Sequence, residues 1–118
     1  GVKLLNFTLE QAVAADAGKN LWTPYTIPAG TYPGQAEDVQ TIAQPNFLAT
    51  HADLSEENVY MITKTIYENL AFLQAIHPAT KAMAIEVAIA GLPVPLHPGA
   101  QRYYEEVGVE IPARLIAQ

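Results

Sequence analysis

The segment Ile27–Gln35, which reads Ile-Pro-Ala-Gly-Thr-Tyr-Pro-Gly-Gln, constrains the fold of this chain more than any other stretch. It shows neither helical nor strand periodicity, and it carries two turn patterns in succession. Ile27–Gly30 has proline second and glycine fourth, as in a type I turn, whereas Tyr32–Gln35 has proline second and glycine third, as in a type II turn. Because each proline fixes one dihedral at about −65°, the loop has little conformational freedom to lose.

The side chains between the two turns make this loop a candidate binding site. Thr31 and Tyr32 carry the only hydroxyl groups of the loop. The neighbouring glycines leave backbone N–H groups unshielded, as in the small concavities that bind anions. The candidate ligand-binding residues are therefore Thr31, Tyr32, Gly34 and Gln35. The pattern itself does not name the ligand.

The N-terminal third of the chain predicts a strand followed by a helix. Val2–Phe7 is a short β-leaning run. Thr8 and Gln11 have the spacing of a capping box, which predicts a helix over Leu9–Ala17. Asn20–Thr26 contains a proline and is predicted to be a loop. A strand that leads directly into a helix favours an α/β arrangement of layers.

The middle of the chain predicts a broken strand and a long helix. Val39–Thr50 has strand-like composition, but Pro45 splits it, as expected where a chain passes between two lobes. Ser55 is a good N-cap for the longest predicted helix, Glu56–Ile76, whose apolar side chains recur at helical spacing.

The C-terminal part predicts further helices. Ala79–Ala90 is alanine-rich and helical in pattern, and Leu92–Leu96 is a proline-stiffened extended link. Pro98 suits the first turn of a helix over Pro98–Val107, with Gly108 as its C-cap. The fold class predicted from these patterns is α/β, with few strands and four to five helices.

Composition and charge exclude several classes of function. A chain of 118 residues provides one domain or less. Its net charge of −6 and six scattered basic residues disfavour nucleic acid as a partner, because phosphate binding needs clustered Lys and Arg. The absence of cysteine excludes disulfides and thiol catalysis. The chain begins at Gly1 without a methionine, so we expect a mature product or a piece of something longer.

No catalytic or metal-binding constellation is visible in the sequence. Ser55 is the only serine, and a helix N-cap explains it. His51, His77 and His97 lack the partners at helical spacing that a metal site uses. We therefore expect no enzyme activity, no cofactor and no metal, and we interpret the chain as a binding module.

Several of these motifs occur together in one known family. They are Ile27–Gln35, the pair Asp38-Val39, the helix around Tyr60–Leu70, the Leu-His-Pro-Gly-Ala segment Leu96–Ala100, the pair Tyr103-Tyr104, and Gly108. In this combination, from about Val2 to Gly108, the chain resembles the C-terminal part of the TAXI family. These proteins are the extracytoplasmic solute receptors of tripartite ATP-independent periplasmic (TRAP) transporters.

The resemblance implies that the chain is a fragment of a two-lobed periplasmic-binding-protein-like (type II) fold located in the periplasm. Within the single unit 1–118, residues 1–38 would belong to the second lobe, 39–51 to a hinge-crossing strand, and 52–118 to the helical part of the first lobe. The implied ligand is a small anionic solute, glutamate- or glutamine-like or another carboxylate. The implied protein partners are the membrane subunits of a TRAP transporter.

An alternative from another class stays open. The chain would then be a helical protein-interaction or regulatory domain without a small-molecule ligand, and the Pro-Gly loop would be purely structural. Under the receptor interpretation, apolar surfaces that face the rest of the receptor would be exposed, and large apolar patches seldom stay solvated. We therefore expect self-association, through Val39–Thr50 or the C-terminal tail.

Overall fold

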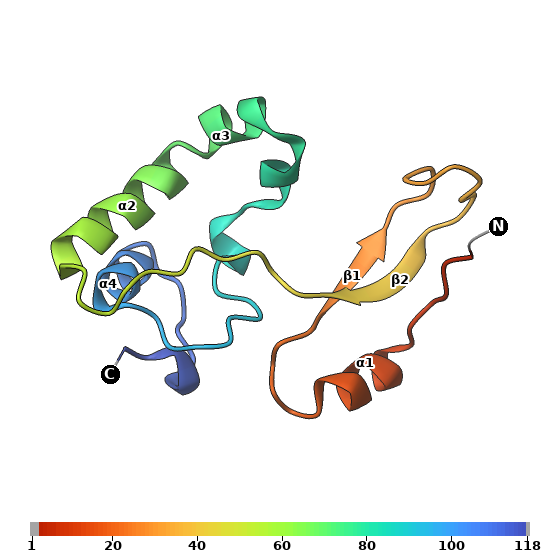
Figure 1. Ribbon diagram of the computed structural model, residues 1–118, viewed down its shortest axis with the longest axis horizontal. Helices are drawn as coiled ribbons and strands as arrows, with labels where there is room; N and C mark the ends of the chain where they lie inside the picture. Colours follow the sequence, from red (N-terminus) through yellow and green to blue (C-terminus); the bar gives the residue numbers. More distant parts are fainter. Residues whose placement is uncertain (1–2, 118) are drawn as a thin grey trace. The chain divides into compact units, whose positions relative to one another are not determined.

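A computed structural model describes residues 3–117, and Figure 1 shows the order of their elements. The described residues contain four α-helices, two strands and three short 3-10 helices, so the mixed α/β class predicted from the sequence is confirmed. The chain divides into two compact units. The first comprises residues 1–46 with 91–93, and the second comprises residues 47–90 with 94–118.

Helix α1 (Leu9–Asp16) of the first unit begins at the predicted capping box. The Thr8 hydroxyl accepts a hydrogen bond from the Gln11 N–H at 3.2 Å, and the Thr8 N–H donates to the Gln11 side chain at 2.9 Å. The helix ends one residue earlier than predicted, because Ala17 and Gly18 both adopt left-handed conformations, with φ of 50° and 76°.

A two-stranded antiparallel sheet completes the regular structure of the first unit. It pairs β1 (Thr23–Ile27) with β2 (Val39–Ala43). Strand β1 corrects the prediction of a loop over Asn20–Thr26. Pro24, opposite Ile42, was the reason for expecting a break. In a two-stranded sheet both strands have an open edge, so a proline can direct its missing N–H away from the partner strand.

The predicted first strand, Val2–Phe7, is not a regular strand in residues 3–7, and Val2 lies outside the described residues. The end of this segment nevertheless lies against β2. The Phe7 N–H donates to the Gln40 carbonyl at 2.8 Å, and the Gln40 N–H donates to Asn6 Oδ1 at 2.8 Å. A side-chain amide therefore replaces one of the backbone carbonyls that a continuous strand would supply.

The predicted broken strand Val39–Thr50 is confirmed only in its first half. Strand β2 occupies Val39–Ala43, whereas residues 47–50 carry no regular structure. The boundary between the two units falls after residue 46, inside this stretch. The assignment of residues 1–38, 39–51 and 52–118 to two lobes and a hinge stays a prediction.

The single predicted helix Glu56–Ile76 is two helices in the second unit, α2 (Glu56–Glu68) and α3 (Leu70–Ile76). The break falls at Asn69, which has φ of −118° and ψ of 27°. The Asn69 side chain donates to the Thr65 carbonyl at 2.8 Å. Asparagine commonly competes in this way with the backbone for hydrogen bonds, and this explains why the helix stops at an otherwise regular apolar pattern.

Helix α4 (Pro98–Glu106) packs along α2 and forms the core of the second unit with it (Figure 1). His97 caps α4 by accepting a hydrogen bond from the Gly99 N–H at 3.2 Å. The buried side chains here include Val59, Thr63, Tyr103, Tyr104 and Leu115. Leu115 lies on the C-terminal 3-10 helix η3 (Ala113–Leu115) and is only 1% exposed, so the tail is an integral part of this core.

The alanine-rich segment Ala79–Ala90 does not form the predicted α-helix. It contains two 3-10 helices, η1 (Pro78–Ala82) and η2 (Ile85–Val87). Gly91 follows with φ of 69°. In the described part of the chain, none of the helices combines the length and apolarity needed to cross a bilayer.

Candidate functional site

The second turn of the Pro-Gly loop has the predicted geometry. The Gln35 N–H donates to the Tyr32 carbonyl at 3.1 Å, which closes a four-residue turn. Gly34, the third residue of this turn, has φ of 82°. A type II turn requires positive φ at this position, and glycine adopts it without steric cost.

The first turn is displaced by one residue from the predicted Ile27–Gly30. The Thr31 N–H donates to the Pro28 carbonyl at 3.2 Å, so the turn runs from residue 28 to residue 31. Gly30 then occupies the third position rather than the fourth, and its φ is 77°. The type I prediction was therefore wrong, and both turns are type II in pattern.

The side chains of two of the four candidate ligand-binding residues are engaged inside the loop. The Thr31 hydroxyl donates to the Pro28 carbonyl at 2.6 Å. The Gln35 amide nitrogen lies within 3.2 Å of the carbonyls of Ile27, Pro28 and Glu37. Because these polar groups are satisfied by backbone, their first effect is to fix the shape of the loop.

Most backbone N–H groups of the loop also have internal acceptors. The Ala29 N–H donates to the Asp38 carboxylate at 2.7 Å, and the Tyr32 N–H lies 3.3 Å from the Gln35 side-chain oxygen. The Tyr32 hydroxyl and the Gly34 N–H are different, because neither bonds to any residue between 3 and 117. Tyr32 is 53% exposed, and among the candidate side chains its hydroxyl is the donor without a partner in the described residues.

The loop offers neutral donors and no cation of its own. No lysine or arginine occurs between Lys19 and Lys64 in the sequence. The charged residues nearest to the loop in the sequence are Glu37 and Asp38, and the Asp38 carboxylate is already bound to a backbone N–H. A solute held here would be recognised through hydrogen bonds from a hydroxyl and a peptide group.

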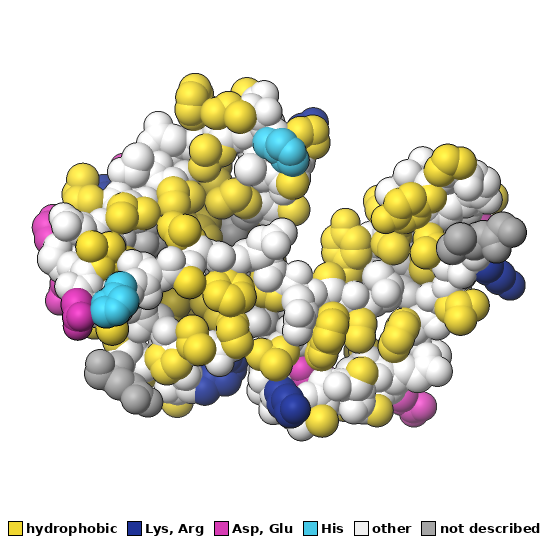
Figure 2. All heavy atoms as spheres, viewed as in Figure 1, with side chains coloured by type: hydrophobic (Ala, Val, Ile, Leu, Met, Phe, Trp, Pro, Cys, Tyr) yellow, Lys and Arg dark blue, Asp and Glu magenta, His cyan; other side chains and the backbone are white. Residues whose placement is uncertain are grey.

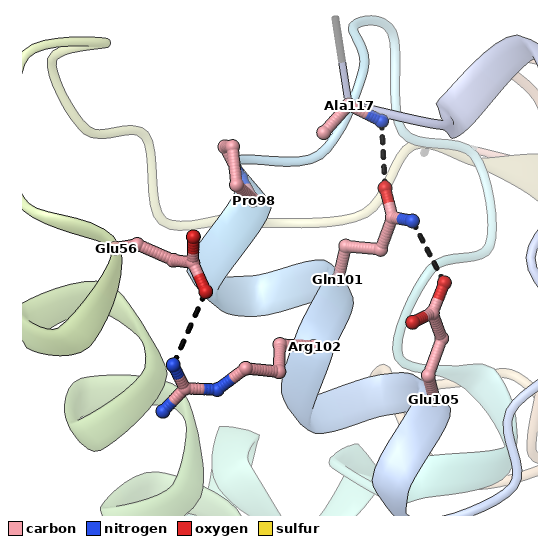
Figure 3. Close-up of a pocket in the computed structure, with 6 residues that line it drawn as sticks. All are labelled: Glu56, Pro98, Gln101, Arg102, Glu105 and Ala117. Carbon is pink, nitrogen blue, oxygen red and sulfur yellow. Dashed lines mark hydrogen bonds and ion pairs between the residues drawn. The ribbon is translucent and has the colours of Figure 1, made fainter.

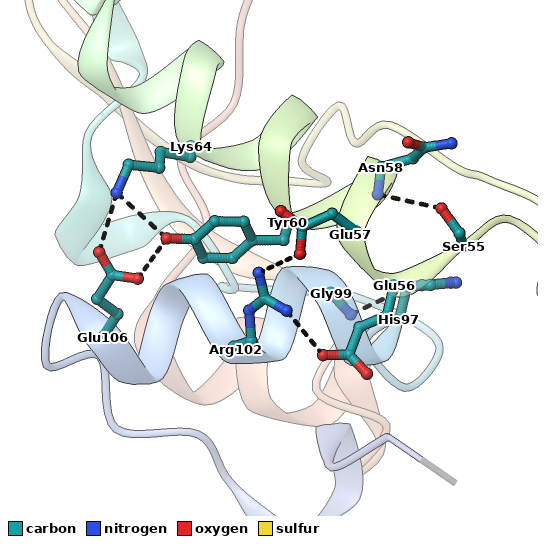
Figure 4. Close-up of polar contacts among 10 residues, drawn as sticks. All are labelled: Ser55, Glu56, Glu57, Asn58, Tyr60, Lys64, His97, Gly99, Arg102 and Glu106. Atoms are coloured by element: carbon teal, nitrogen blue, oxygen red, sulfur yellow. Dashed lines mark hydrogen bonds and ion pairs between the residues drawn. The ribbon is translucent and has the colours of Figure 1, made fainter.

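The second unit carries a charged cluster on the surface where α2 meets α4 (Figure 4). The Arg102 guanidinium contacts Glu57 at 2.8 Å and Glu56 at 3.1 Å, and it lies 3.8 Å from the centre of the Tyr60 ring. The hydrogen bond to Glu57 is the main cause that raises the pKa of Arg102. The positive charge of Arg102 is therefore already paired with carboxylates of the protein.

A second set of contacts joins Tyr60 and Lys64 of α2 to Glu106, the last residue of α4 (Figure 4). The Tyr60 hydroxyl donates to Glu106 at 2.6 Å, and Lys64 donates to Glu106 at 3.0 Å. Both hydrogen bonds lower the pKa of Glu106, and the bond from Tyr60 has the larger effect. The pKa of Lys64 is raised, mainly by its hydrogen bond with Tyr60 and then by that with Glu106. This cluster holds α2 against α4, and both cations have carboxylate partners.

An open depression of about 420 Å³ lies beside this cluster (Figure 3). Gln101 spans part of it, accepting a hydrogen bond from the Ala117 N–H at 2.7 Å and donating to Glu105 at 2.7 Å. The remaining lining residues are Glu56, Pro98 and Arg102. Because two carboxylates line the depression and Arg102 is paired, its charge does not favour an anion.

The histidines and the serine have local structural roles. His77 and His97 each accept a hydrogen bond from the N–H two residues later, at 3.1 and 3.2 Å. Ser55 caps α2, and exposed His51 lies 3.2 Å from Asp53. Among residues 3–117, no three His, Asp or Glu side chains gather as a metal site would require.

Sequence reasoning missed Asp38 and Arg102. Asp38 was noticed only as part of a motif, although an acidic residue soon after a turn is a common acceptor for backbone N–H groups. The pairing of Arg102 with Glu56 and Glu57 joins residues about 45 positions apart, and no local pattern signals it.

The described residues form one unit with a helix and a two-stranded sheet, which carries the proline-fixed loop, and a second unit that is helical. The family follows from comparison with known proteins: residues 1–108 match the model of the NMT1-like family. The match covers most of the chain, and the chain belongs to that family, which is periplasmic-binding-protein-like. Membership suggests a solute-binding role and an extracytoplasmic location. The finer TAXI assignment stays a prediction.

Proposed function

We propose that this chain is part of an extracytoplasmic receptor that binds a small anionic solute for a TRAP transporter. The solute class is an amino acid or carboxylate of the glutamate type. Family membership over residues 1–108 is the observation that carries the proposal. The two-lobed architecture, the solute and the transporter partner come from the TAXI resemblance of the Pro-Gly loop and the Leu96–Ala100 segment.

The loop supports the proposal because some of its polar groups fix its shape and others remain available to a ligand. Thr31 and Gln35 hold the two turns by bonding to backbone carbonyls. Tyr32 and Gly34 present an unpaired hydroxyl and N–H from that fixed frame, within the described residues. A preorganised donor pair lowers the ordering cost of binding. In this proposal Tyr32 and Gly34 contact the solute, and Thr31 and Gln35 position them.

The proposal predicts that Tyr32→Phe weakens solute binding without loss of stability. Removing the hydroxyl should raise the dissociation constant about fivefold or more, which is about 1 kcal/mol. Tyr25→Phe is the matched control, because Tyr25 lies on β1 in the same unit and is 51% exposed, against 53% for Tyr32. Isothermal titration calorimetry with L-glutamate, L-glutamine and succinate measures the effect, and L-lysine serves as the cationic control.

Two results would contradict the proposal. One is the absence of saturable binding of every anionic probe, at millimolar concentration, to the full-length receptor that contains this chain. The other is equal affinity in Tyr32→Phe and Tyr25→Phe, which would show that the loop is structural.

The second candidate function is the helical protein-interaction domain, and one observation favours it. Helix α3 contains no buried residue, although six of its seven residues are apolar. A chain that binds no solute in calorimetry but self-associates through α3 would support this candidate over the receptor.

A further inference from the structure

The loop that joins β1 to β2, residues 28–38, is held in shape mainly by hydrogen bonds (Figure 1). Residues 28–36 contain no charged side chain, and Figure 2 shows hydrophobic and uncharged side chains over most of the visible surface of this loop. All of its residues except Gln35 are exposed, so burial contributes little to its shape. Apart from the fixed φ angles of Pro28 and Pro33, the hydrogen bonds therefore decide where the tip of the loop lies.

The two turns of the loop are bonded to each other. The Gly30 N–H of the first turn donates to the Gln35 carbonyl of the second turn at 2.9 Å. The Tyr32 N–H, between the turns, lies 3.3 Å from the Gln35 side-chain oxygen. Residues 28–35 therefore form one unit of structure, here called the two-turn block, and Tyr32 moves with this block.

Two side chains bond the two-turn block to the base of the loop. One is Gln35, whose amide nitrogen lies within 3.2 Å of three backbone carbonyls there. The other is Asp38, whose carboxylate oxygen Oδ1 accepts a hydrogen bond from the Ala29 N–H at 2.7 Å. Asp38 directly precedes β2, so this bond joins the two arms of the loop just beyond the last pair of the strands, Ile27 with Val39.

The bond between Ala29 and Asp38 is of a strong type. A carboxylate acceptor gives a shorter and stronger hydrogen bond than a neutral oxygen does, and about 2.7 Å is the short end of the range for such bonds. The Ala29 N–H has no second acceptor among the described residues. Without Asp38, the two-turn block would be bonded to the base of the loop through the Gln35 side chain alone.

We propose that Asp38 is a positioning residue for solute binding, which holds the first turn through the Ala29 N–H and thereby places Tyr32 and Gly34. This inference rests on the proposed function, because the two donors that Asp38 positions are those assigned there to the solute. A negative charge close to a site for an anion opposes binding, so Asp38 helps the site through the hydrogen bond that it accepts and not through its charge.

Two substitutions separate the hydrogen bond from the charge. Asp38→Asn and Asp38→Ala both remove the charge, but only asparagine keeps a side-chain oxygen that can accept from the Ala29 N–H. The full-length receptor that contains this chain is titrated with whichever of L-glutamate, L-glutamine and succinate binds the native receptor. Asp38→Ala should bind this probe about threefold or more weakly than Asp38→Asn does.

The neighbouring acidic residue supplies a matched pair of controls. The Glu37 carboxylate has no hydrogen bond or ion pair with any residue between 3 and 117. Glu37→Ala and Glu37→Gln also remove one charge each and differ in the same way in their side-chain oxygen. These two variants should therefore bind the probe alike.

Nitrogen-15 relaxation of the same receptor gives a readout that needs no ligand. The backbone order parameters of Ala29, Tyr32 and Gly34 should fall in Asp38→Ala, because the two-turn block loses one of its two attachments. They should stay at their native values in Asp38→Asn. Unchanged order parameters in β1 and β2 confirm that each variant keeps the sheet.

The outcomes separate this inference from the proposed function. Equal affinity of Asp38→Ala and Asp38→Asn overturns the role of Asp38, and so do unchanged order parameters in Asp38→Ala or an equal difference within the Glu37 pair. If Tyr32→Phe weakens binding and Asp38→Ala does not, the proposed function stands and only the role of Asp38 is lost. If the native receptor binds none of the probes, the proposed function fails, and Asp38 is then a structural residue of the loop only.

Discussion

Replacing Gly99 by alanine tests whether the close crossing of α2 and α4 organises the second unit. A Cβ at residue 99 would collide with the Glu56 carbonyl and lie 2.7 Å from the Tyr60 nitrogen. It would also lie 3.0 Å from Val59 Cβ. The first two neighbours are backbone atoms, so no change of rotamer relieves the contact. The helices themselves must move apart.

Two opposing effects determine the size of the change. Alanine is favoured over glycine inside a helix by about 1 kcal/mol. Overpacking costs about 1–3 kcal/mol, and more where backbone must shift. Separating the helices also weakens ring contacts such as that of Tyr60 with Tyr103, whose centroids lie 6.2 Å apart and which contributes about 0.5–1.5 kcal/mol. We expect Gly99→Ala to lower the unfolding free energy of the second unit by about 2–3 kcal/mol.

Urea unfolding measures this change with a separate probe for each unit. The only tryptophan, Trp22, lies in the first unit, whereas the tyrosine cluster lies in the second. Near-UV circular dichroism of the tyrosines should show the loss, and Trp22 fluorescence should not. Gly108→Ala is the control: it has φ of 80° and open space around it, so its cost of about 1–2 kcal/mol is purely conformational. If Gly99→Ala were as stable as the native chain, the close crossing would be refuted.

Two further predictions concern the N-cap of helix α2 and the pH dependence of stability. Ser55→Ala should lower the unfolding free energy by about 0.5–2 kcal/mol in urea titrations, and Ser55→Asp should restore most of it. The pKa of Glu106 lies below its ordinary value of 4.5, mainly because the carboxylate accepts a hydrogen bond from the Tyr60 hydroxyl. The pKa of Asp16 lies below its ordinary value of 3.8, mainly because the carboxylate accepts a hydrogen bond from the Trp22 N–H. Each ionised carboxylate therefore favours the folded state above those values, and this stabilisation disappears as the pH falls through the lowered pKa. The thermal midpoint should fall from about pH 5 downward, and less steeply in Glu106→Gln.

The features that could be predicted from the sequence are those set within four residues of one another. The capping box of Thr8 and Gln11, the N-cap Ser55, and the positive φ of Gly34 all appear in the structure as expected. Each depends on one side chain or one dihedral acting on the adjacent turn, so the chemistry is visible in the sequence itself.

The features that could not be predicted depend on competition or on distant partners. Asn69 ends a helix that apolar spacing would continue, because its side chain bonds to the backbone of the previous turn. Pro24 lies inside a strand because, in a two-stranded sheet, every strand is an edge strand and tolerates a proline. The number of strands in the sheet cannot be read from the sequence around Pro24. In the sequence, Arg102 is one of six scattered basic residues. Its contacts with Tyr60 and two glutamates could not be predicted, because these partners are distant in the sequence.

The same distinction applies to the candidate site and decides what each residue there can do. Hydroxyl and amide side chains between two turns predicted a binding loop, but the pattern could not separate groups that bind a solute from groups that build the loop. Thr31 and Gln35 donate hydrogen bonds to backbone carbonyls. Such a bond must be broken before the donor group can bind a ligand. Tyr32 carries no such cost within the described residues, so the test of solute binding belongs at its hydroxyl.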